Sequence, residues 1–144
     1  KKNVFEFFSQ AESNVFQKLQ LKLLLGAGLR FKTMKTLYLG SGLMRVEEKL
    51  KNKSVDKYDM ANIYISYKNI FKFKTPLKMV YNIYYQPRLS NPDDCNIIQN
   101  IYFSIPLNSH LNIQFKINYK HDSTPAIGVK KEDISQQTSI TYIF

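Results

Sequence analysis

The stretch LNIQFKINYK, residues 111–120, alternates apolar and polar residues without a break. Leucine, isoleucine, phenylalanine and tyrosine occupy its odd positions, and asparagine, glutamine and lysine occupy its even positions. Successive side chains of a β-strand point to opposite faces, so this period of two predicts a strand with one apolar and one polar face. The same alternation is typical of a soluble sheet and of a membrane barrel. The rest of the chain has to indicate which solvent each face meets.

Length and composition limit the class of protein. The chain has 144 residues, which suits one domain, and we predict a single domain over residues 1–144. The hydrophobic fraction of 44% is too high for disorder. The sequence contains no apolar run of the ~18 residues that a membrane-spanning helix needs, so a helical membrane protein is excluded. The single cysteine, Cys95, allows no internal disulfide and is interpreted as a small, half-buried residue.

The formal net charge of +10 raises the question of a nucleic-acid partner. Such recognition requires basic residues that are gathered in a patch or along a helix, whereas here they are spread along the predicted strands. The sequence has no zinc-finger spacing and no phosphate-binding glycine loop. It has no second histidine at metal-ligand spacing from His110. We therefore expect no nucleic acid, no metal and no cofactor.

Alternation and chain breakers predict eight extended segments and no helix of ordinary length. The segments cover residues 3–14, 18–31, 36–50, 57–69, 75–87, 95–106, 111–121 and 133–144. A typical globular strand has about 5 or 6 residues, whereas a tilted strand that crosses a bilayer needs about 9 to 11. The segment lengths therefore favour an antiparallel transmembrane barrel over a soluble β-sandwich.

The connections between the segments are predicted to alternate in length. Residues 51–56, 88–94 and 122–132 form the longer set, and residues 32–35, 70–74 and 107–110 form the shorter set. Outer-membrane barrels show such alternation, with short periplasmic turns and longer extracellular loops. The third segment departs from clean alternation, and Gly40 and Gly42 are candidates for a bend or bulge in it. The faces of this segment cannot be assigned from the sequence.

The chain ends in QTSITYIF, residues 137–144. Ile140, Tyr142 and Phe144 share one face, and the last residue is aromatic. This end resembles the C-terminal insertion signal of bacterial outer-membrane proteins, although Ser139 stands where that signal usually has glycine. The resemblance implies that the barrel-assembly machinery and outer-membrane lipid are partners of the chain.

Several short motifs, taken in order, resemble the DUF481 family of salt-induced outer-membrane proteins of the YdiY type, and above all its Bacteroidetes-like members. The motifs are EFFSQAESN, LLGAGLRF, MRVEEK, YYQP, DDCN and HDSTPAIGVKKED, followed by the terminal TYIF. The late loop matches the family at Asp122, Ser123, Pro125, Gly128, Val129 and Asp133, with His121 in place of a tyrosine and Ala126 in place of a second proline. The resemblance implies the C-terminal two-thirds of a barrel of about twelve strands in the bacterial outer membrane. Alternatively, the eight strands close by themselves.

The polar faces of these strands would line the lumen of such a barrel. Its predicted basic lining is Lys18, Lys22, Arg30, Lys68, Lys78, Lys116 and Lys120, set against Glu6 and Glu12. Basic residues raise the local concentration of anions, so an open lumen would form a weakly anion-selective, porin-like pore. If the same charges pair with carboxylates, they fill the lumen instead.

We therefore expect a non-enzymatic outer-membrane barrel, either a small pore or an envelope-stress barrel. The alternative is a structural or accessory subunit that binds other outer-membrane proteins in a larger complex. A lipid A-modifying enzyme is a third hypothesis, in which Ser123 is the nucleophile, His121 its base and Glu132 the orienting acid. Because Asp122 and Ser123 also form the ordinary loop motif of the family, no catalytic residue is assigned.

Overall fold

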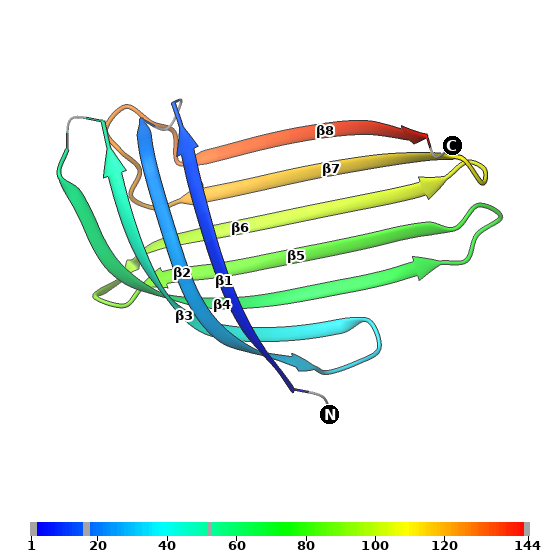
Figure 1. Cartoon of the computed structure of the whole chain (residues 1–144), viewed down its shortest axis with the longest axis horizontal. Coiled ribbons are helices and arrows are strands. Elements are labelled where there is room, and N and C mark those ends of the chain that lie inside the picture. The colour runs from blue at the N-terminus through cyan, green and yellow to red at the C-terminus, as the bar shows by residue number, and fades with distance from the viewer. Residues whose placement is uncertain (1–2, 16–17, 52, 143–144) are drawn as a thin grey trace.

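The computed structural model describes residues 3–15, 18–51 and 53–142 of the chain. Every regular element in these ranges is a β-strand, and they include no helix long and apolar enough to cross a membrane. The strands are β1 (Asn3–Asn14), β2 (Leu19–Lys32), β3 (Leu37–Leu50), β4 (Val55–Phe71), β5 (Leu77–Arg88), β6 (Asn91–Pro106), β7 (Leu111–Asp122) and β8 (Glu132–Tyr142). They form one antiparallel sheet in which each strand pairs with the next (Figure 1). The predicted all-β, up-and-down order is confirmed.

The predicted alternation of long and short connections is wrong. β6 begins at Asn91 rather than at residue 95, and Arg88 pairs with Asn91 across a turn of residues 89–90. The register shifts between Pro87 and Arg88, and Pro92, which falls in the predicted connection 88–94, lies within β6. Residues 123–131 remain as the long connection in the part of the chain that the structure describes.

The sheet is strongly curled but does not close on itself. β1 and β8 are its two edges, so the described strands form an open half-barrel (Figure 1). The edges come together at one end, where the Lys120 Nζ lies 3.6 Å from the Glu12 Oε1. At the other end they diverge, so that the start of β1 and the end of β8 lie far apart (Figure 1). The alternative in which these eight strands close by themselves is therefore not observed.

The curl gives the sheet an inner and an outer face. Glu6 on β1 contacts Tyr64 on β4, and strands that are not neighbours can meet in this way across the hollow of a curled sheet. The face that carries these two residues is therefore the inner face. The small buried core also lies on it and consists of Met44, Val46 and Met60.

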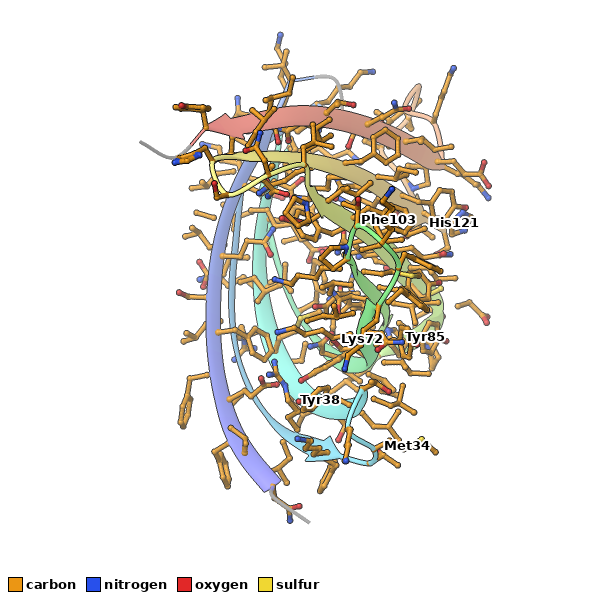
Figure 2. All side chains as sticks on the ribbon, turned by 90° about the vertical axis from the view of Figure 1, so that its right-hand side faces the viewer. Met34, Tyr38, Lys72, Tyr85, Phe103 and His121 are labelled. Carbon is orange, nitrogen blue, oxygen red and sulfur yellow. The ribbon has the colours of Figure 1, made fainter. Side chains whose placement is uncertain are left out.

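The outer face is apolar and exposed. Phe7 on β1 is 81% exposed, Leu25 on β2 is 68% exposed and Ile65 on β4 is 43% exposed. In Figure 2, Tyr85 and Phe103 lie on this face, at odd positions of β5 and β6. The alternation in residues 111–120 follows the same rule, because the register puts Ile117 with Tyr81 on the outer face and Asn118 with Asn82 on the inner one.

β3 reverses this polarity near its C-terminal end, which explains why its faces could not be assigned. Met44 and Val46 are buried on the inner face, while Arg45 and Glu47 point outward. The outward pair is neutralised by β4: the Arg45 Nε lies 3.3 Å from the Asp59 Oδ1, and the Lys57 Nζ lies 2.7 Å from the Glu47 Oε1.

The two glycines of β3 do not form a bulge, because the β3–β4 register runs without a shift. Gly40 lies directly beneath the ring of Tyr64, and a Cβ at this position would overlap that ring. Gly42 faces Gly28 across the β2–β3 ladder, where a Cβ would meet backbone atoms. The glycines therefore allow close approach across the inner face rather than a break in the ladder.

Candidate functional site

The inner face is the candidate site because polar side chains of all eight strands converge on it. Cross-strand register aligns five of them in one row from β4 to β8, which we call the amide row: Ser66, Asn82, Asn100, Asn118 and Ser135. The Asn118 Nδ2 donates to the Ser135 Oγ at 3.0 Å. Amides and hydroxyls both donate and accept hydrogen bonds, so this row offers a surface that water can wet.

A network of three polar side chains lies beside the amide row and joins β1, β2 and β4. The guanidinium of Arg30 pairs with the carboxylate of Glu6, and the Arg30 Nε donates to the Tyr64 hydroxyl at 2.9 Å. The Tyr64 hydroxyl in turn donates to Glu6. These residues border a cavity of about 480 Å³ whose apolar wall includes Phe8 and Met44. The network holds the first strand against the middle of the sheet.

Charges are paired where the sheet edges meet. The Lys22 Nζ lies 3.7 Å from the Glu48 Oε2, and the Arg88 Nη1 lies 3.2 Å from Asp56 and 3.4 Å from Asp94. The Lys120–Glu12 contact described above belongs to the same region. We call this region the ion-paired end, and it is the end that carries the connections 15–18, 51–54, 89–90 and 123–131.

The loop of residues 123–131 is fixed over the ion-paired end by the residues that we matched to the family motif. The Ser123 Oγ donates to the Asp93 carbonyl at 2.8 Å and accepts from the Cys95 amide at 2.8 Å. The Asp122 Oδ1 accepts from the Thr124 amide at 3.0 Å, which forms a side-chain turn. Gly128 adopts a φ of +81°, a conformation that glycine reaches without steric cost.

The remaining motif residues of this loop lie near the seam between the sheet edges. Pro125, Val129 and Asp133 border a small cavity together with Lys22 and Lys120. These motif residues therefore place the loop close to β2 and β7.

The predicted lining residues fall into three groups. Lys22, Arg30 and Lys120 lie on the inner face in the ion pairs given above. Lys68, Lys78 and Lys116 share the inner face with the amide row, and the structure gives them no acidic partner among the residues that it describes.

The prediction that Lys18 lines the inner face is wrong. Lys18 lies in the turn before β2 with a φ of 56°, and its Nζ donates to the Ile127 carbonyl at 2.8 Å. Because β2 begins at Leu19, the alternation does not extend to Lys18. Its side chain fastens the β1–β2 turn to the long loop instead of lining the inner face.

Basic residues occur in both halves of the sheet, as the sequence leads us to expect, whereas the acidic residues are gathered in one half. The connections 33–36, 72–76 and 107–110 meet at the end opposite the ion-paired end. We call this the lysine-rich end, and its residues are Lys32, Lys35, Lys68, Lys72, Lys74, Lys78 and Lys116. Every aspartate and glutamate of the sequence except Glu6 lies in the other half of the strands or in their connections. Antiparallel order collects every second connection at one end, so residues that are distant in sequence form one charged surface.

Of the three hypothetical catalytic residues, His121 and Glu132 contact each other, whereas Ser123 is linked to neither by the described hydrogen bonds. The Ser123 hydroxyl is engaged with two backbone groups, and the described hydrogen bonds do not join it to His121. The His121 Nδ1 lies 3.8 Å from the Glu132 Oε1, on the outer face of the β7–β8 pair. Within the described ranges, no group of three or more histidine, cysteine, aspartate or glutamate residues could hold a metal ion.

The fold and its site define an all-β protein whose curled half-barrel sheet has a polar inner face and an apolar outer face. Residues 1–144 match the family model described as "Protein of unknown function, DUF481". No curated protein and no solved structure matches the chain. The chain belongs to the DUF481 family, and the match covers its whole length.

Proposed function

We propose that the chain forms the wall of a β-barrel in the bacterial outer membrane, with lipid on its outer face and water on its inner face. The strands support this proposal because they contain between 11 and 17 residues, which is enough to cross a bilayer at a tilt. The outer face supports it as well. Its exposed phenylalanine, leucine and isoleucine side chains would be costly in water, since each buried aliphatic side chain is worth about 1.5 to 3 kcal/mol.

The barrel forms a weakly anion-selective pore. One observation carries this proposal: Lys68, Lys78 and Lys116 line the hollow side of strands whose other side is apolar. Cationic side chains that face water inside a low-dielectric wall concentrate anions and repel cations. No catalytic group takes part, because the barrel acts by passage of solutes rather than by chemistry.

A structural or accessory role in a larger complex is the second candidate, and it has its own support. At the ion-paired end the inner-face charges neutralise one another, and the 123–131 loop covers them. A lumen that is closed there would conduct no ions. The unpaired β1 and β8 edges also offer hydrogen-bonding groups to further strands, either of a barrel of about twelve strands or of another outer-membrane protein.

Insertion through the barrel-assembly machinery is part of the same proposal. Ile140 and Tyr142 lie on the outer face of β8, with 69% and 56% of their surface exposed. Phe144, the last residue of the predicted signal, lies outside the described residues. An exposed edge strand with these side chains is a suitable substrate for an assembly machine that pairs strands.

Single-channel conductance in a planar bilayer tests the pore. We expect a conductance that prefers chloride to potassium, and a loss of that preference in the triple variant Lys68→Gln, Lys78→Gln, Lys116→Gln. The matched control is Lys49→Gln, Lys51→Gln, Lys53→Gln, which removes the same charge at the opposite end of the sheet. Silence from inserted protein would contradict the pore and support the structural role. Release of the protein from membranes by buffer without detergent would refute the membrane assignment itself.

A further inference from the structure

Exposed apolar side chains stand beside the lysines at the turns of the lysine-rich end. Met34, next to Lys35, is 63% exposed, and Phe73, between Lys72 and Lys74, is 65% exposed. Figure 2 looks onto this end, with Met34 and Lys72 labelled at its turns. The third turn adds Leu107, which is also exposed. Each of these turns therefore places an apolar group in solvent.

This combination fits the headgroup layer of a bilayer. A lysine ammonium binds phosphate while its aliphatic stem and a neighbouring phenylalanine or methionine reach toward the acyl chains. An anionic membrane surface attracts each nearby lysine by about 1 kcal/mol. No carboxylate of the sequence falls in the three turns, so nothing there repels a phosphate.

The connections also indicate which leaflet this end meets. Outer-membrane barrels keep their short turns on the periplasmic side and their longer loops outside. The turns 33–36, 72–76 and 107–110 lie at the lysine-rich end, whereas the ion-paired end carries the longest connection, 123–131, beside the short connections 51–54 and 89–90. With this one long loop on the outside, the lysine-rich end of the proposed barrel faces the periplasm and the phospholipid leaflet.

We propose that Lys35, Lys72 and Lys74, with Met34 and Phe73, form a binding surface for the headgroups of anionic glycerophospholipids. The surface selects these lipids over zwitterionic ones and fixes the depth and direction of the barrel in the membrane. This inference rests on the proposed membrane function. It does not require an open pore.

Electron spin resonance with spin-labelled lipids tests the surface. The full chain is folded into phosphatidylcholine vesicles, and the lipid immobilised by the protein is measured with labelled phosphatidylglycerol and with labelled phosphatidylcholine. We expect a several-fold preference for phosphatidylglycerol at low salt, which falls in about 1 M salt because exposed charges are screened. In the triple variant Lys35→Gln, Lys72→Gln, Lys74→Gln the preference should fall to about one.

The control variant is again Lys49→Gln, Lys51→Gln, Lys53→Gln, which should keep the preference of the native chain. Equal loss in both triple variants would show an effect of net charge alone and would overturn the proposal. A native chain without preference would overturn it too, as would stronger immobilisation of labelled lipid A than of phosphatidylglycerol. Failure of the chain to enter vesicles of any of these compositions would instead refute the membrane assignment, so the two failures are distinguishable.

Discussion

At the residue scale, the long loop depends on one backbone conformation. Gly128 has a φ of +81°, and a side chain in the left-handed region costs about 1 to 2 kcal/mol. We predict that Gly128→Ala lowers the free energy of unfolding by about that amount, and that Gly128→Asn costs less because asparagine tolerates this region. Urea unfolding of the folded protein, followed by tyrosine fluorescence, measures both variants. Equal stability of the alanine variant and the native protein would contradict the prediction.

The hydroxyl of Tyr64 gives a second prediction at this scale. It accepts from Arg30 and donates to Glu6, so it links two strands to a third across the hollow. We expect Tyr64→Phe to cost about 1 to 3 kcal/mol, since the hydrogen bonds involve charged groups. Tyr84→Phe is the matched control, because its ring lies 5.3 Å from that of Tyr64 and no described hydrogen bond involves its hydroxyl. A larger loss in the control, measured by the same unfolding experiment, would show that the network does not stabilise the sheet.

At the element scale, substitutions on the two faces of β4 test whether the outer face of the sheet meets lipid or water. Ile65 points outward and Ser66 points inward. In a membrane, Ile65→Lys should cost about 2 to 4 kcal/mol near the midplane, whereas Ser66→Lys adds a charge to a wet face at little cost. The fraction of each variant that folds into vesicles, read from the shift in gel mobility on heating, measures the difference. If the outer face meets water, the two variants should fold equally well.

Elements also show where sequence patterns succeed and fail. The residues 111–120 predicted β7 and its faces correctly, because one periodicity of two persists along its whole length. The faces of β3 could not be assigned, because Met44 and Val46 pack in the small core while Arg45 and Glu47 form ion pairs with residues of β4. The position of such partners depends on register with a neighbouring strand, and a single sequence segment does not carry that information.

At the scale of the whole molecule, exchanging the charges of one ion pair tests whether the sheet edges meet at the ion-paired end. Glu12 on β1 and Lys120 on β7 are paired across the seam between these edges, although neither strand neighbours the other. We predict that Glu12→Lys lowers the free energy of unfolding by up to about 1 kcal/mol, the usual range for a solvent-accessible pair. The double variant Glu12→Lys, Lys120→Glu should recover much of this loss. Additive effects in the double-mutant cycle would mean that the edges do not meet there.

The candidate site was predictable in part. Alternation placed Lys22, Arg30, Lys68, Lys78, Lys116 and Lys120 on the face that is now seen to be the inner one. It failed at Lys18, where the strand had not yet begun, and it gave no sign of the lysine-rich end. That surface could have been anticipated by assigning the halves of alternate strands to opposite ends of the sheet, because the acidic residues other than Glu6 then all fall in the opposite half.

The sequence by itself determined the class of the fold, the strand order and the polarity of most faces. These features are local, because side-chain direction alternates with each residue and antiparallel neighbours need short connections. Tertiary structure alone decided which charges are paired, how far the sheet curls and where its edges meet. Contacts such as Glu6 with Tyr64 and Glu12 with Lys120 depend on curvature, which is summed over the twist and close packing of many strands. For this reason the chain's own pattern predicts a lining of lysines, whereas the folded sheet separates those that are neutralised from those that remain available to bind an anion.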